Sequence, residues 1–222
     1  DLNEKASRTP IGVKADFLYQ SGFNYVSFLV PGVLAMTAML GCTFQMLALV
    51  LERSLGTLDR ILVTPVRPRS IILGKTLAGC LTGFSQAILI LLLAHILFDI
   101  AVGSTHLVLF IIFVTSFTFT GIGVLVSGIS RDPREAAAFT QIINWPLVFL
   151  GGVFFPVEMM PLPLQYISRM LPLTYATDAL RSIMIRQAPL AMNVIFDMLV
   201  LTVYAIATLT LGSRILLRLL AG

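Results

Sequence analysis

The sequence predicts an all-α polytopic membrane protein. Of its 222 residues, 57% are hydrophobic and only 12% are charged, and the mean hydropathy is +0.94. An ordinary soluble domain carries about 25% charged residues. The apolar residues gather in long uncharged runs, and about 20 such residues in a helix cross the hydrocarbon core of a bilayer. The length of the chain indicates a single transmembrane domain over residues 1–222.

Five runs are long enough to span a membrane. The expected spans are residues 27–50, 71–98, 106–129, 137–155 and 194–217. Residues 1–26 come before them and become aromatic toward their end, which is typical of a membrane interface. Before the fourth span, Asp132, Pro133 and Glu135 stand at the N-cap, first and third positions of a predicted helix. This pattern is a strong helix-start signal.

Residues 156–193 are not expected to span. They contain five prolines, which separate two short amphipathic pieces at about 162–171 and 175–187. These pieces are too short to cross a bilayer and too apolar to be free loops. We therefore predict a re-entrant or interfacial hairpin.

The positions of the basic residues orient the spans. Nine of the fifteen Lys and Arg residues lie in residues 51–75, in the loop at 130–135 or in the C-terminal tail. Because Lys and Arg concentrate in cytoplasmic loops, these segments are expected inside. Residues 1–26 and 156–193 are then outside. The net charge of +4 is explained by this asymmetry, and no nucleic-acid partner is expected.

Residues 51–70 form the most informative segment. Four leucines recur with helical spacing on one side, and three polar residues recur on another; they are Leu51, Leu55, Leu58 and Leu62, and Arg53, Thr57 and Arg60. Gly56 weakens the helix by about 1 kcal/mol relative to Ala and allows a bend. Pro65 and Pro68 end the pattern. The segment is expected to be a short helix on the membrane surface; a solvated basic loop that fixes topology is the alternative.

Few residues in the chain carry recognisable chemistry. Gly74-Lys75-Thr76 is not a phosphate loop, because Arg69 stands where that motif needs its first glycine. No catalytic constellation, cofactor motif or metal-ligand spacing is present in the sequence. Gln141 and Asn144 lie inside a span, where they either bond to neighbouring helices or line a substrate path. His95 and His106 are either solvated at the span ends or paired around a metal.

Several motifs in order resemble one family. Phe28-Leu29-Val30-Pro31-Gly32, then Glu52-Arg53 with Gly56-Thr57-Leu58 and Arg60, then Thr64-Pro65-Val66 and Gly74-Lys75 are similar to the permease subunit of type 2 ABC transporters. Gly151-Gly152-Val153-Phe154-Phe155-Pro156 and Leu171-Pro172-Leu173-Thr174-Tyr175 resemble its external hairpin. The daunorubicin-resistance-like branch of drug and lipid exporters is the most similar.

The resemblance implies a multi-pass subunit of the plasma (inner) membrane that works as a homo- or heterodimer. It implies export of a lipid, glycan or amphipathic drug, driven by a separate cytoplasmic ATPase that holds ATP and Mg. Residues 51–70 would be the coupling helix, with Glu52, Arg53, Gly56, Thr57, Arg60 and Pro65 at the ATPase contact. The family has six spans per subunit and five are visible, so the first family helix is expected to be missing from this chain.

Two other classes stay open on the residues alone. An ion-driven transporter or channel needs carboxylates or broken helices at the membrane midplane, where the expected spans hold no acid. A membrane-embedded enzyme or assembly factor would have to rely on His95 and His106.

Overall fold

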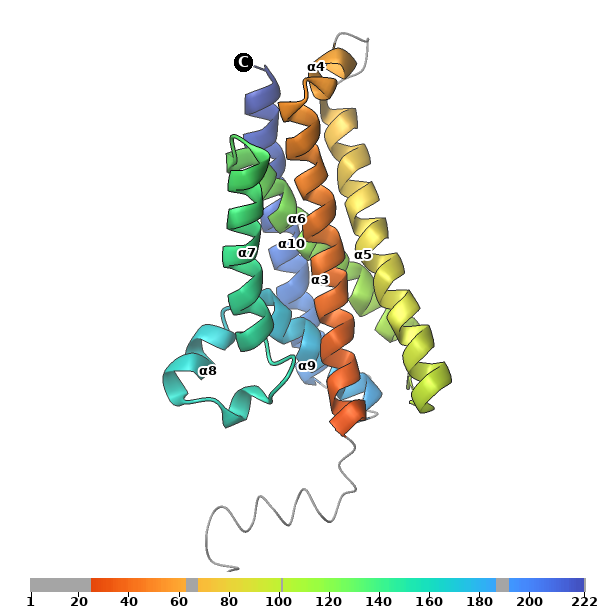
Figure 1. Ribbon diagram of the computed structural model, residues 1–222. Coiled ribbons are helices and arrows are strands. Elements are labelled where there is room, and N and C mark those ends of the chain that lie inside the picture. The colour runs from red at the N-terminus through yellow and green to blue at the C-terminus, as the bar shows by residue number, and fades with distance from the viewer. Residues whose placement is uncertain (1–24, 63–67, 101, 187–191, 222) are drawn as a thin grey trace, which may run out of the picture.

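The computed structural model describes residues 25–62, 68–100, 102–186 and 192–221, and it is a bundle of helices (Figure 1). Every regular element in these residues is helical. In order they are α3 (Tyr25–Ser54), α4 (Thr57–Leu62), α5 (Pro68–Phe98), α6 (Thr105–Ile129), α7 (Pro133–Leu150), the 3-10 turn η1 (Val157–Met159), α8 (Leu162–Ser168), α9 (Pro172–Met184) and α10 (Met192–Ala221). The all-α prediction is confirmed.

Four of these helices, α3, α5, α6 and α10, are long and apolar enough to cross a membrane. The remaining expected span, the fourth in chain order, corresponds to α7, which runs beside α3 (Figure 1). With 18 residues α7 is about 27 Å long, and it is less apolar because Arg134, Glu135 and Gln141 lie in it.

The bundle has two central and two peripheral spanning helices. In the most apolar stretch, 67% of the residues of α6 and 53% of those of α3 are buried, against 22% for both α5 and α10. Large apolar side chains cover the outside of α5; they include Leu73, Leu77, Leu81, Leu89, Leu92 and Ile96. A helix surface of this kind is suited to lipid.

The spanning helices approach one another closely at small residues. A Cβ atom added to Gly41 of α3 would lie 2.9 Å from the Cα of Gly83 in α5, and one added to Gly83 would lie 2.5 Å from the carbonyl oxygen of Ala38. The two helices therefore pack closely at Gly41 and Gly83. Without a hydrophobic driving force between helices in lipid, such contacts are a main source of helix association.

Helix α7 begins as predicted and ends earlier than predicted. The Asp132 carboxylate accepts a hydrogen bond from the Glu135 backbone N–H at 2.8 Å, and the Glu135 side chain accepts one from the Arg131 N–H at 2.7 Å. The fourth span was expected to reach residue 155, but α7 stops at Leu150 because Gly152 has a φ of +74°. Glycine adopts this left-handed conformation without the usual steric cost.

The hairpin at 156–193 contains two short helices near the expected positions, α8 and α9. Residues 187–191 lie outside the described part of the chain. Helix α9 does not rest on a surface: it packs against α3, α6 and α10, and eleven of its thirteen residues are buried. It is part of the core of the bundle.

Candidate functional site

The predicted coupling segment lies at one end of the bundle, beside the C-terminal end of α10 and the start of α7 (Figure 1). The first helix continues to Ser54, and the chain then turns at Gly56, which has a φ of +67°. Helix α4 follows after this turn. The expected single helical face is therefore wrong, since Leu51 and Leu55 are exposed while Leu58 is 1% exposed.

Leu58 fixes α4 to the bundle. It packs in a small apolar cluster with residues of α3, α5, α6 and α10; the cluster is Leu49, Leu58, Ile72, Val124 and Leu216. Burying one leucine side chain contributes about 1.5–3 kcal/mol. Helix α4 is thus held by the buried Leu58 side chain, in a cluster that contains one residue from each of four other helices.

The polar candidates of this segment divide into two groups. Thr57 and Arg60 are exposed on α4, and Arg53 is half-buried. Glu52 instead turns inward and pairs with Lys75 Nζ of α5 at 2.5 Å, with both side chains about 30% exposed (29% and 30%). Pro65 lies outside the described residues.

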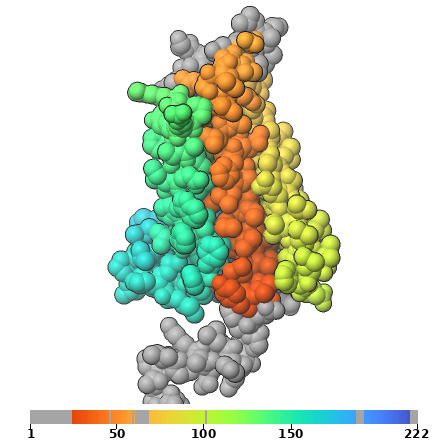
Figure 2. Space-filling model, viewed as in Figure 1, coloured from red at the N-terminus to blue at the C-terminus, as the bar shows by residue number. Residues whose placement is uncertain are grey.

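Gln141 and Asn144 meet in a groove between α3 and α7. This groove has a volume of about 450 Å³ and is otherwise apolar; its lining is Met36, Leu40, Phe44, Gln141, Asn144, Trp145, Val148, Phe149 and Phe154. Figure 2 shows α3 as a strip of surface between α7 and α5 on this face of the molecule. Both amides therefore lie at one groove, and its volume is in the size range of a small-molecule site.

Asn144 is the buried member of this pair. Its side chain is 2% exposed, and Nδ2 donates a hydrogen bond to Thr43 Oγ1 of α3 at 3.2 Å. Its Oδ1 atom is buried and has no hydrogen-bond partner in the described structure. A buried acceptor without a partner costs about 1–3 kcal/mol, so Asn144 is a costly residue at this position in the wall of the groove.

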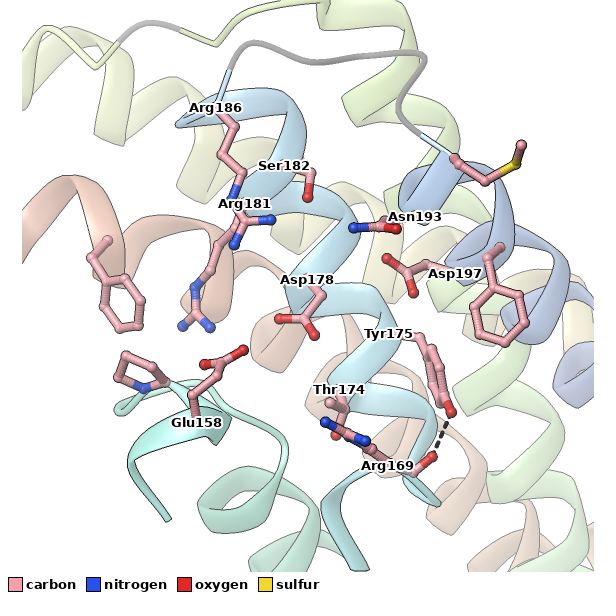
Figure 3. Close-up of a pocket in the computed structure, with 14 residues that line it drawn as sticks. Glu158, Arg169, Thr174, Tyr175, Asp178, Arg181, Ser182, Arg186, Asn193 and Asp197 are labelled. Carbon is pink, nitrogen blue, oxygen red and sulfur yellow. Dashed lines mark hydrogen bonds between the residues drawn. The ribbon is translucent and has the colours of Figure 1, made fainter. Parts of the chain in front are cut away.

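A second and larger pocket lies at the opposite end of the molecule, beside α9 and α10 (Figure 3). Its volume is about 720 Å³. The charged residues that line it are Glu158, Arg169, Asp178, Arg181, Arg186 and Asp197. Sequence patterns indicated no site here, although charged residues in so apolar a chain are a signal that could have found it.

Arg181 forms the wall between this pocket and the end of α7. It is 8% exposed, its guanidinium donates hydrogen bonds to the carbonyls of Gly152 and Val153, and its Cζ lies 3.8 Å from the centre of the Phe28 ring. Burial lowers the pKa of Arg181 to about 10, which leaves it protonated at neutral pH.

Side chains of the hairpin satisfy four consecutive carbonyls at the C-terminal end of α7. Ser168 Oγ donates to Leu150 O at 2.6 Å, Thr177 Oγ1 donates to Gly151 O at 2.8 Å, and Arg181 serves the next two carbonyls. The last carbonyls of a helix have no partner within it. A cation there also complements the helix dipole.

Two other expectations concern metal and thiol chemistry. His95 Nδ1 lies 3.1 Å from the carbonyl oxygen of Ile100, and among the described residues no group of three or more His, Cys, Asp or Glu is arranged to hold a metal ion. Cys42 and Cys80 are buried and free.

These features define an integral membrane protein with a short helix that exposes polar residues at one end, a lateral groove and a charged pocket at the other end. The model of the family "ABC-2 family transporter protein" matches residues 1–214, and the chain belongs to this family. The predicted resemblance to type 2 ABC permeases is confirmed.

Several relatives are similar along much of this chain. YbhR of Escherichia coli (strain K12), named as a probable multidrug ABC transporter permease, is 29% identical over 188 residues, which cover 83% of this chain and 51% of YbhR. Nodulation protein J of Rhizobium leguminosarum bv. viciae is 28% identical over 212 residues, 89% of this chain and 76% of that protein. ABC transporter G family member 20 of Dictyostelium discoideum is 26% identical over 165 residues, 73% of this chain and 23% of that protein. The chain thus spans about half the length of YbhR.

Proposed function

We propose that this chain is the membrane-spanning permease subunit of an ATP-driven exporter, with a separate cytoplasmic ATPase docking on residues 51–70. The observation that carries the proposal is the structure of that segment. Thr57 and Arg60 are presented to solvent on a helix that is anchored in the bundle by Leu58. A helix used only to fix topology would not need such an anchor.

The anchor gives the docked ATPase a mechanical path into the membrane. Leu58 belongs to one apolar cluster with residues of α3, α5, α6 and α10, and the Glu52–Lys75 pair joins α3 to α5. A movement of α4 is therefore transmitted to four helices. Packed elements of this kind shift between discrete arrangements rather than deform gradually. ATP and Mg belong to the partner in this scheme, and the permease itself catalyses no reaction.

The groove between α3 and α7 is the proposed substrate path. Its lining is mainly aromatic and aliphatic, with two amides, which suits an amphipathic molecule such as a lipid, a lipid-linked glycan or a drug. Trp145 and Phe149 are exposed beside it and stack with ring centres 5.8 Å apart. We propose that a second permease subunit, identical or related, faces this surface and closes the path.

The docking proposal can be tested with two charge reversals at the same end of the bundle. Thr57→Glu combined with Arg60→Glu places acids on α4, and Arg134→Glu reverses an exposed arginine at the start of α7. We expect the first variant to lose association with the ATPase and stimulation of ATP hydrolysis, with Arg134→Glu close to wild type. Equal behaviour of the two variants would refute docking on residues 51–70.

A further inference from the structure

The pocket beside α9 and α10 has two acidic residues inside, and two arginines and Glu158 are exposed at its mouth. Asp197 is 8% exposed, and Asp178 is half-buried, whereas Arg169 and Arg186 are exposed. Figure 3 shows the Asp178 side chain, from α9, directed toward Glu158, and the Asp197 side chain, from α10, directed toward α9; both line the pocket. Arg181, the buried cation of the pocket, is already engaged by backbone carbonyls.

The two carboxylates lack partners of their own. Neither Asp178 nor Asp197 makes a hydrogen bond or an ion pair with any residue in the described part of the chain. Removing an ionised carboxylate from water without a partner costs several kcal/mol. Burial accordingly raises the pKa of the Asp178 carboxyl above its usual value. Two carboxylates whose burial costs free energy, and which lie in one pocket, are suited to binding a cationic ligand.

The neighbours of the carboxylates point to an organic cation. Tyr175 and Phe196 line the same pocket, with ring centres 6.3 Å apart. Aromatic faces next to carboxylates are a recurring arrangement for binding an ammonium group. A metal ion would need more ligands, and the described residues contain no cluster of three or more His, Cys, Asp or Glu arranged to bind one.

The mouth adds a second requirement. Arg169 and Arg186 are exposed along the pocket lining and outnumber the one exposed acid, Glu158, so the mouth carries a net positive charge that disfavours a ligand with positive charge alone. A ligand that carries an anionic group next to its ammonium would place the ammonium at the buried carboxylates and the anion at the exposed arginines. Arginine is also the residue best suited to hold a phosphate, through two parallel hydrogen bonds.

We propose that this pocket binds a zwitterionic headgroup, with the ammonium between Asp178 and Asp197 and the phosphate at Arg169 and Arg186, as in phosphoethanolamine. Its volume of about 720 Å³ accommodates a headgroup and the start of its chains. This inference goes beyond the proposed function: it depends neither on the ATPase nor on the groove between α3 and α7.

The test uses the full chain purified in an uncharged detergent. Binding of dihexanoyl phosphatidylethanolamine and dihexanoyl phosphatidylglycerol is measured by calorimetry; the two lipids share chains and phosphate, and only the first has an ammonium. We expect the ethanolamine lipid to bind at least tenfold more tightly. Equal affinity for the two lipids would overturn the proposal.

Three variants locate the site. Asp197→Asn and Asp178→Asn remove one charge each with little change of shape, and each should weaken binding of the ethanolamine lipid at least tenfold. Asp99→Asn is the matched control, because Asp99 is exposed at the α5–α6 turn and does not line the pocket. Unchanged binding in both pocket variants, or an equal loss in Asp99→Asn, would overturn the proposal.

The melting temperature separates binding from folding. Since Asp197 has no partner in the described structure, Asp197→Asn should leave the melting temperature unchanged or raise it. A large fall would show that Asp197 is a structural residue, and would overturn its assignment as a ligand. Glycerophosphoethanolamine, which has the headgroup without chains, distinguishes the two sources: binding equal to the lipid's indicates recognition of the headgroup alone, and weaker binding that is still lost in Asp197→Asn indicates a lipid.

Discussion

The two ends of the bundle are built in opposite ways. At the end that carries α4, a short helix projects from the bundle and is held by the Leu58 side chain and a half-exposed ion pair beside it. At the end that carries α9, this helix is buried among three others, and side chains of α8 and α9 satisfy four consecutive carbonyls at and just after the end of α7. The first arrangement offers polar groups to a partner, and the second encloses a pocket within a rigid wall.

The largest effect is expected from breaking the rigid end at Arg181. Arg181→Met keeps the volume but removes the donors to Gly152 and Val153 and the contact with the Phe28 ring. Leaving buried carbonyls without donors should destabilise the protein by about 3 kcal/mol. Thermal unfolding in detergent measures the loss. Arg181→Lys keeps the charge without the planar fork, and should fall between wild type and Arg181→Met; equal stability of all three proteins would contradict the role of Arg181 as an anchor.

The next largest loss of stability is expected at Leu58, which anchors α4 to the bundle. Leu58→Ala should cost about 2 kcal/mol, because it removes a buried side chain from the cluster that holds α4. Leu55→Ala, at a 67% exposed leucine, should change stability by less than about 0.5 kcal/mol. Hydrogen exchange should show faster opening of α4 in Leu58→Ala alone. An equal increase in both variants would mean that Leu58 does not fix the helix.

A smaller effect is expected in the groove between the two ends. Asn144→Leu removes the hydrogen bond to Thr43 together with an unsatisfied acceptor, so the stability should change by only about 0.6 kcal/mol. Transport of an amphipathic dye, measured in vesicles with the ATPase present, should nevertheless fall. Normal transport by this variant would exclude Asn144 from the substrate path, and Thr43→Val serves as the control for loss of the hydrogen bond alone.

The smallest effect is expected at the Glu52–Lys75 pair. Both side chains are about 30% exposed, so solvent and salt screen their attraction. A double-mutant cycle with Glu52→Gln and Lys75→Met should give a coupling of about 0.5 kcal/mol that declines in high salt. A coupling energy above about 2 kcal/mol would mean that this ion pair, rather than Leu58, is the main interaction that holds this end of the bundle together.

Sequence reasoning succeeded where a local pattern decides the structure. The uncharged runs, the Asp132 cap and the proline-bounded hairpin were all readable because helix periodicity, capping and hydropathy act over short distances. The bend at Gly56 was foreseen as a possibility, but the spacing of the four leucines suggested one continuous face. The left-handed turn at Gly56 rotates Leu58 inward and leaves Leu55 in solvent, which no periodicity can show.

The pocket beside α9 and α10 depends on contacts between residues far apart in the chain, which a sequence pattern does not show. Asp178 and Asp197 are 19 positions apart in the sequence, with the end of one helix and the start of another between them. Phe28, which packs on Arg181, comes from the far end of the chain. Gln141 and Asn144 were easier to find, since they lie three positions apart on one helix and share a face.

The close contact of α3 and α5 at Gly41 has a mechanical consequence. Gly41 stands midway along α3, thirteen residues from Ser54 beside α4 and thirteen from Phe28 beneath Arg181. Each half is about 20 Å long at 1.5 Å per residue. A rigid α3 that tilts about this point is a lever with equal arms, so a displacement of the α4 end would reappear at Phe28 with the same amplitude and the opposite direction.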